Sequence, residues 1–493
     1  MTGCRLCTQV GQASILSQRR KPLSLQRQRP KGGPNMNSDV KVKEIEVFFE
    51  PVKARIPLKF GGVVMDSAIL CKTRVLVETR DGKRGEGWGA MFLADFWAWP
   101  TPKVPHETRE AIMRRIAQGY ADMLASYPEY AHPIDIFWDL EPELKALGAQ
   151  ASEAEGAAET MPFLGSLVCA SPSDAALHDA FGVANDIDTY RGYGPEFMGD
   201  LSRYLGEEFK GRYIADFIRP EYLPEIAVFH LVGGLDKLTR AELDETDPDD
   251  GMPSCLEDYI ARDGVFCLKV KLRGNDLDWD VERMIAVHDV AGPALARLGI
   301  GELFLTADTN EMCDSPDYII EMLNRVRERR PSAFERTLYI EQPTGRDLAG
   351  LGHDMRALAR IKPVLVDESL TDLESFALAI QQGWSGIALK ACKTQSAALV
   401  MAAKARAMRV PYAVQDLTNP GLALFHSVGL AARLYTIKGV EANSRQFFPA
   451  ATTLAEKTVH AGIFHVRRGY ANTWSLQGPG LGFQMKRIMA LGG

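Results

Sequence analysis

The sequence has 493 residues, of which 46% are hydrophobic and 25% charged, and its formal net charge is −7. This composition is typical of a globular enzyme, and the negative charge argues against nucleic acid or an anionic membrane as a partner. No apolar run is long enough to cross a bilayer, and eight thinly spread cysteines indicate reduced thiols, so we expect a cytoplasmic protein.

The N-terminal segment differs from the rest of the chain. Residues 1–36 are rich in arginine and lysine, and no acidic residue precedes Asp39. Two interpretations stay open: a transit peptide that directs import into an organelle, or a disordered basic leader, including the case in which translation starts at Met36. In either case residues 1–36 are not expected to take part in the fold.

Residues 37–222 are predicted to form an α+β domain, because strand patterns come first and helical patterns follow. Asp81-Gly82 predicts a hairpin turn. Ser171-Pro172 predicts the start of a helix that Gly182 ends. The expected strands are 42–49 and 69–78, and the expected helices are 107–124 and 171–182.

Near residue 225 short apolar strands begin to alternate with helices. Strands without polar alternation are typical of a parallel sheet that is buried on both faces. Eight such units within residues 223–455 predict an α/β fold, a (β/α)8-type TIM barrel, and residues 456–493 form a final segment. An open doubly wound sheet is the rival, but its glycine-rich phosphate turn is missing, since Gly478, Gly480 and Gly482 follow the last strand. The predicted strands are Ile226–Val232, Val265–Leu272, Leu303–Asp308, Leu338–Glu341, Val364–Asp367, Gly386–Lys390, Tyr412–Asp416 and Val440–Asn443.

Acidic residues end three consecutive strands of this barrel. Asp308, Glu341 and Asp367 stand at the carboxyl ends, where TIM barrels have their active sites, so we expect them to converge. Three carboxylates at one point repel each other unless a cation joins them, and oxygen ligands suit Mg²⁺, with Mn²⁺ as the alternative. For any one acid taken alone, a helix N-cap is the rival interpretation. Further polar residues follow these strands, namely Asn310, Glu368 and Asp416, which are expected to support the site, and Gln415, Glu441 and Asn443.

Lysines flank the acids on both sides. Lys269 and Lys271 are two residues apart on one strand and therefore point the same way. Adjacent ammonium groups lower each other's pKa, so a neutral lysine base is expected here. Lys390 comes from the opposite wall, so that a planar intermediate would have a lysine on each face. The rival interpretation is a solvated strand edge with extended lysines.

These motifs resemble those of the enolase superfamily, within the mandelate racemase/muconate lactonizing enzyme family and its muconate-lactonizing branch. The resemblance implies a capping domain over the barrel mouth, to which residues 456–493 return, and a homo-oligomer. It also implies Mg²⁺ held by Asp308, Glu341 and Asp367, with Lys271 and Lys390 as acid/base groups and Lys269 tuning Lys271. The matching motifs are Arg55-Ile-Pro-Leu-Lys-Phe60, Lys269-Val-Lys271, Asp308-Thr-Asn310, Ile340-Glu341-Gln342-Pro343, Asp367-Glu368-Ser369, Lys390 and Pro479-Gly-Leu-Gly482.

The sequence also departs from that family. No histidine ends strand seven, where Gln415-Asp416 stands instead, and extra sequence around residues 95–165 lengthens the cap. The substrate therefore cannot be carried over from a relative. Four aromatic residues, with Gly61-Gly62 on a second loop, form either an apolar lid or the core of a domain interface: Phe92, Phe96, Trp97 and Trp99.

The expected function is abstraction of the proton α to the carboxylate of a small-molecule substrate, through an enediolate. Racemisation or epimerisation, cycloisomerisation and dehydration all stay open, so the enzyme is an isomerase or a lyase. Two alternatives compete with it: a metal-free Schiff-base aldolase that uses Lys271 or Lys390, and a non-catalytic metal-binding barrel.

Overall fold

The computed structural model describes residues 36–60 and 62–492. The predicted leader, apart from Met36, and Gly61 of the second loop lie outside this part of the chain.

Within the described residues, eight parallel strands close into a barrel, because β11 pairs with β4 as well as with β10. The predicted TIM barrel is confirmed, and each predicted strand is present with small shifts at its ends. The central strands β5 and β9 are buried at every position, as expected for strands covered on both faces. The barrel strands are β4 (Glu225–Val232), β5 (Cys267–Lys271), β6 (Phe304–Asp308), β7 (Thr337–Glu341), β8 (Val364–Val366), β9 (Gly386–Lys390), β10 (Tyr412–Gln415) and β11 (Gly439–Glu441).

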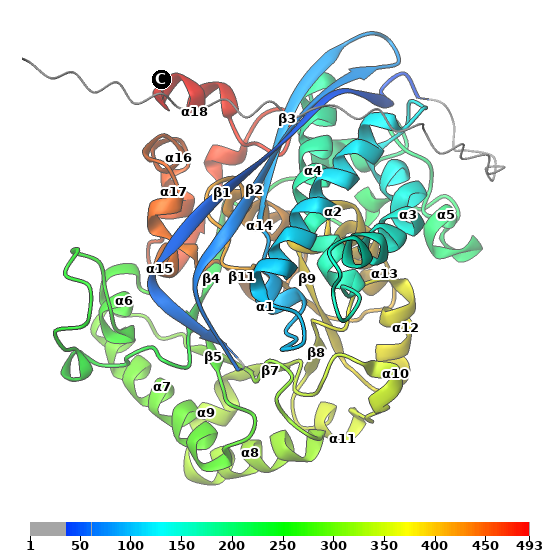
Figure 1. Ribbon diagram of the computed structural model, residues 1–493. Helices are drawn as coiled ribbons and strands as arrows, with labels where there is room; N and C mark the ends of the chain where they lie inside the picture. The colour runs from blue at the N-terminus through cyan, green and yellow to red at the C-terminus, as the bar shows by residue number, and fades with distance from the viewer. Residues whose placement is uncertain (1–35, 61, 493) are drawn as a thin grey trace, which may run out of the picture. The chain divides into compact units, whose positions relative to one another are not determined.

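Helices surround the barrel, as Figure 1 shows. They pack apolar faces against the strands; α8, for example, buries Ile319, Met322, Leu323 and Val326 at the spacing of one helix face. The helices along the barrel are α6 (Leu256–Asp263), α7 (Leu277–Arg297), α8 (Pro316–Arg329), α9 (Pro331–Arg336), α10 (Leu348–Leu351), α11 (Arg356–Ala359), α12 (Leu373–Gln381), α13 (Gln395–Ala407) and α14 (Leu422–Arg433).

The N-terminal part is an antiparallel sheet in the order β1-β2-β3, made of β1 (Val40–Phe60), β2 (Val63–Thr79) and β3 (Arg84–Phe92). The predicted turn at Asp81-Gly82 joins β2 to β3, and Gly82 has a φ of 89°. Helices then follow, as predicted: α1 (Asp95–Ala98), α2 (His106–Ser126), α3 (Pro133–Ala154) and α4 (Phe163–Ala184). This arrangement confirms an α+β domain beside the barrel.

The helix predicted over 171–182 is wrong at its start, and it does not end at Gly182 but continues to Ala184. It belongs to α4, which begins at Phe163 and runs through Pro172. Ser171 does not cap a helix; its hydroxyl donates to the main-chain oxygens of Leu167, at 2.8 Å, and Cys392, at 2.5 Å. Because α4 is buried on nearly all sides, between the cap sheet and the barrel, tertiary packing outweighs the helix-breaking tendency of Pro172.

The C-terminal segment contacts both parts of the molecule. β12 (Tyr470–Asn472) pairs antiparallel with β4 of the barrel. Further on, the amide of Leu481 donates to Asp179 of α4 at 2.6 Å, and Gly480 exchanges main-chain hydrogen bonds with Ile187 and Thr189. The return of the tail to the cap fits the predicted organisation, while the domain boundaries at 37–222, 223–455 and 456–493 stay predictions.

No helix in residues 36–60 and 62–492 has the length and apolar character that a membrane span requires. The cytoplasmic location and the homo-oligomeric state stay predictions.

Candidate active site

The strand register brings the predicted acids and lysines to one end of the barrel. Lys271 of β5 pairs with Asp308 of β6, and Asp308 pairs with Glu341 of β7. Asp367 directly follows β8, and Lys390 ends β9. All five side chains are buried. The strand register thus places these five residues at one end of the barrel.

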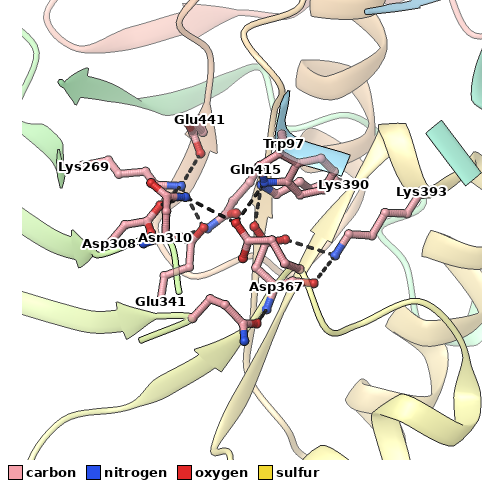
Figure 2. A network of polar contacts seen from close by, with 12 residues as sticks. Trp97, Lys269, Asp308, Asn310, Glu341, Asp367, Lys390, Lys393, Gln415 and Glu441 are labelled. Atoms are coloured by element: carbon pink, nitrogen blue, oxygen red, sulfur yellow. Dashed lines mark hydrogen bonds and ion pairs between the residues drawn. The ribbon is translucent and has the colours of Figure 1, made fainter. Parts of the chain in front are cut away.

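Lys269 lies at the centre of the acids. Its Nζ is 3.1 Å from Asp308 Oδ2, 2.9 Å from Glu341 Oε1 and 2.9 Å from Glu441 Oε2. Figure 2 shows the lysine reaching the carboxylates from the β5 side. Glu441, which ends β11, was visible as a strand-end acid in the sequence, but its contact with Lys269 was not predicted.

Lys271 occupies the outer position on the same strand. Its Nζ donates to Asp308 Oδ2 at 2.5 Å and to Asn310 Oδ1 at 2.8 Å. Asn310 has a φ of 46°, and its main-chain amide donates to Asp308 Oδ1 at 2.8 Å. The predicted support residue thus orients both the acid and the lysine.

Two lysines approach from the opposite wall. Lys390 Nζ lies 2.7 Å from Asp367 Oδ2, and Lys393 Nζ lies 3.0 Å from Asp367 Oδ1 (Figure 2). Lys393 also donates to the main-chain oxygen of Asp367. Lys393 was not among the predicted site residues, although its spacing of three residues from Lys390, across the turn η5 (Ala391–Lys393), is a usable signal.

Burial and charge together set the protonation of the acids. Burial, followed by the repulsion of Asp308, raises the pKa of Glu341 to about 8. Burial alone would raise the pKa of Asp308 as well, but Lys271 and Lys269 outweigh it and lower that pKa to about 2. The carboxylates therefore differ sharply in how readily they hold a proton.

The pKa of Lys269 shifts in the direction opposite to the one predicted. Burial favours the neutral form of Lys269, but Glu341 and Glu441 outweigh it and raise the pKa of Lys269 well above its ordinary value. The pKa of Lys390 is raised in the same way, since Asp367 outweighs burial. The prediction of a lowered pKa for Lys269 counted burial and the neighbouring ammonium group, and it omitted the larger effect of the acids.

The other predicted support residues border the same site. Glu368 Oε1 accepts from Asn310 Nδ2 at 3.3 Å, and burial raises the pKa of Glu368 to about 7. Asp416 accepts from the amide and side chain of Asn419, at 2.9 and 2.6 Å, and burial raises its pKa to about 7. Asn419 in turn accepts from the amide of Phe92, at 3.1 Å, so Asp416 is linked to the cap.

A contact that was not predicted joins Gln415 Nε2 to Glu341 Oε2 at 2.5 Å.

The donor set suits a hard divalent cation. The acids offer only oxygen atoms, and Oε2 of the buried Glu368 accepts no hydrogen bond from any described residue. As the side chains stand, however, no group of three His, Cys, Asp or Glu residues in the described chain is placed to hold a metal ion. Instead, the Lys269 ammonium bridges Asp308 and Glu341.

Two hollows meet at this site. The inner one has a volume of about 50 Å³ and is bordered by Lys269, Lys271 and Lys390. The outer one, of about 670 Å³, has largely apolar walls that include Phe60 and Phe96. Trp97 borders both. The aromatic residues of the cap were expected to form either an apolar lid or the core of a domain interface, and they divide between the two. The ring of Phe92 packs against that of Phe448, with centroids 4.9 Å apart, as interface core, whereas Phe96 and Trp97 line the mouth of the barrel.

Comparisons with known proteins agree with this architecture. Residues 252–489 match the family model described as "Enolase C-terminal domain-like". No curated protein matches the chain.

Several solved structures share its fold. The muconate lactonizing enzyme from Mycobacterium smegmatis, complexed with muconolactone, is 16% identical, with a TM-score of 0.58 and coverage of 90% of this chain and 96% of that one. The L-Ala-D/L-Glu epimerase from Bacillus subtilis is 16% identical, with a TM-score of 0.55 and coverage of 90% and 98%. The dipeptide epimerase from Cytophaga hutchinsonii, complexed with Mg and the dipeptide D-Ala-L-Val, is 17% identical, with a TM-score of 0.50 and coverage of 84% and 88%. These neighbours are enzymes, and at this identity their likeness establishes the fold.

The match of residues 252–489 to the enolase C-terminal domain-like model and the shared fold of the solved neighbours agree with the predicted resemblance to the muconate-lactonizing branch of the enolase superfamily.

Proposed function

We propose that the protein is an isomerase or lyase that removes the proton α to the carboxylate of a small-molecule substrate. The observation that carries the proposal is the arrangement of lysines on two walls of a small buried cavity, with acids between them. Solved neighbours that bind muconolactone or a dipeptide support a small-molecule substrate.

Mg²⁺, with Mn²⁺ as the alternative, is proposed to bind to Asp308, Glu341 and Asp367. When bound, the ion supplies positive charge next to the substrate carboxylate, where negative charge builds up in the enediolate. To admit the ion, Lys269 has to release Asp308 or Glu341, and Glu441 remains as its partner. Glu368, with one oxygen free of protein hydrogen bonds, can support the ion or its water.

The lysines are proposed to move the proton. Lys271, in its neutral form, takes the α-proton from one face of the substrate. Lys390, as an ammonium group, faces it from the other wall. If Lys390 returns a proton to the same carbon, the configuration inverts; if its proton goes to a leaving group, the outcome is elimination. Asn310 holds Lys271 in place and Gln415 holds Glu341.

The experiment is a panel of α-substituted carboxylates incubated in D₂O with Mg²⁺, with deuterium uptake at the α-carbon followed by mass spectrometry. We expect uptake by the wild type and a loss of about 10²–10⁴-fold in Lys271→Ala and Lys390→Ala, or restriction to one face of the substrate. Lys404→Ala, a change in a lysine on the outer helix α13, is the matched control and should leave uptake unchanged.

Other outcomes point to the alternatives. If the protein binds Mg²⁺ but no carboxylate of the panel takes up deuterium, a non-catalytic metal-binding barrel is the better description. If borohydride traps a substrate on Lys271 or Lys390 and EDTA leaves the activity intact, the Schiff-base mechanism replaces the proposal.

A further inference from the structure

Trp97 is the one residue of the short helix α1 that reaches the lysine site. It is 6% exposed and comes from the capping domain, not from the barrel. Arg346, which follows β7, donates to the main-chain oxygens of Trp97, at 3.1 Å, and Ala98, at 3.0 Å. On the other side, Arg109 of α2 donates to Asp95 at 2.8 Å. The helix is therefore fastened both to the barrel and to the cap.

The indole of Trp97 contacts both charges of the opposite wall. Lys390 Nζ lies 4.6 Å from the ring centroid, and Lys393 Nζ lies 5.9 Å from it. The indole Nε1–H donates to Glu368 Oε1 at 2.9 Å. Lys390 is thus held between the Asp367 carboxylate and an aromatic face, as Figure 2 shows. A desolvated ammonium group over an indole is attracted to it and loses freedom to turn away.

The position of Trp97 between the two hollows gives it a second effect. It borders the inner cavity of about 50 Å³ and the outer hollow of about 670 Å³. The ring therefore stands between the Lys390 ammonium and the wide, open side of the site. In the proposed site, substrate and water would reach the lysines from the outer hollow, so the ring would limit the approach of water to Lys390.

We infer that Trp97 is a positioning residue, which holds the Lys390 ammonium against one face of the bound substrate and screens it from the outer hollow. This inference rests on the proposed function. Among the described interactions, Trp97 contacts Lys390 directly and reaches Lys271 only through Glu368 and Asn310. Loss of the ring should therefore impair proton transfer more on the Lys390 face of the substrate than on the Lys271 face.

Three variants test this inference. Trp97→Leu removes the ring, and Trp97→Phe keeps an aromatic face but loses the hydrogen bond to Glu368. Trp99→Leu is the matched control, because Trp99 is also buried, at 4% exposed, two residues further along, and none of its described contacts involves a lysine. Circular dichroism shows whether each variant folds.

The first measurement is α-exchange in D₂O with each enantiomer of an accepted substrate, with kcat and KM determined separately. In Trp97→Leu, kcat for the enantiomer whose proton faces Lys390 should fall roughly tenfold to a hundredfold, with KM and the other enantiomer little changed. Trp97→Phe should recover most of that loss. Equal losses for both enantiomers, or an equal loss in Trp99→Leu, would overturn the inference.

The second measurement needs no substrate, so it separates this inference from the proposed function. Lys390 is labelled with a water-soluble acylating reagent at a single pH, and the modified peptide is quantified by mass spectrometry. Trp97→Leu should speed the labelling of Lys390 on the order of tenfold, while Trp99→Leu should leave it unchanged. An unchanged rate in a folded Trp97→Leu protein would overturn the screening role even where no substrate is known.

Discussion

The ammonium group of Lys269 contacts three carboxylates at once, from β6, β7 and β11. A buried lysine in such a position neutralises acids that would otherwise repel each other. Under the proposed function, Lys269 and a divalent ion would compete for Asp308 and Glu341, while Glu441 would stay with the lysine. This competition can be measured.

Lys269→Met removes the charge and keeps most of the volume. We expect the protein without added metal to lose about 3–5 kcal/mol of unfolding free energy, because buried carboxylates are left without their partner. Adding Mg²⁺ should then raise the melting temperature of the variant more than that of the wild type. Thermal unfolding with and without Mg²⁺ measures both effects, and Lys404→Met serves as the control. A variant that no longer responds to Mg²⁺ would show that Lys269 helps the ion bind.

For single residues, the sequence predicts which residues lie at the site better than which side chains they contact. Asp308, Glu341, Asp367 and Lys390 could be found because each ends a strand, and strand ends share one side of a parallel barrel. The direction of the lysine pKa shifts could not be found, because it depends on side-chain distances across the barrel. The role of Lys393 was missed because it lies beyond the strand end, on a short turn.

Among the elements, β3 and α4 make an unusually close contact. Alternate residues of β3 are glycines, and they face the backbone of α4. A Cβ atom at Gly87 would lie 2.1 Å from the amide nitrogen of Ala180, and one at Gly89 would lie 2.1 Å from the carbonyl oxygen of Pro172. The helix therefore rests on the sheet with no side chain between them.

Gly87→Ala should separate β3 from α4, or force one of them to shift. We expect a loss of about 1–3 kcal/mol in the free energy of unfolding, because a methyl group is forced into a filled space. Urea unfolding followed by circular dichroism measures it. Gly301→Ala is the control, since a Cβ there meets nothing within 4 Å, and it should change stability by less than about 0.5 kcal/mol. Equal stability of both variants would contradict the packing argument.

The same helix shows where prediction of elements fails. Its twenty-two residues are buried on almost every side, so the 3.6-residue repeat that marks a half-exposed helix is missing. Ser171-Pro172 was then the strongest local signal, and it was misread as a start. The barrel strands were easier to predict than α4, since a short apolar run between polar ends needs no repeat to be recognised.

In the molecule as a whole, the described residues form one compact unit rather than a separable cap and barrel. The cause lies in α4, which contacts the cap sheet through β3 and the barrel through the segment after β9. Asp174 of α4 accepts from the amide and hydroxyl of Ser396, at 3.0 and 2.7 Å, and His178 lies 2.8 Å from the same hydroxyl. Buried polar contacts of this kind are lost together when either part unfolds.

We therefore expect cap and barrel to unfold in a single transition. Differential scanning calorimetry should give one peak, with a van't Hoff enthalpy close to the calorimetric one. Gly87→Ala, a change in the cap, should move that whole peak to lower temperature. Two peaks, or a shift in only part of the signal, would indicate that the two parts unfold independently.

The sequence also predicted the architecture at this scale, and for a physical reason. A parallel barrel repeats one simple pattern eight times, so errors at single strand ends do not change the result. The cap has no such repeat, and its helices could be placed only approximately.

The hydrogen bonds of Asp179 have a consequence for the newly made chain. Its carboxylate accepts from Trp88 of the cap sheet and from Leu481, almost four hundred residues later. On the same late segment, β12 pairs with β4, the first strand of the barrel. During synthesis on the ribosome, the earliest parts of the structure must therefore wait for the last residues to emerge, and until then Asp179 and the outer side of β4 lack their final partners. A chaperone that shields these surfaces during translation would act on the step at which this fold is most exposed to misassembly.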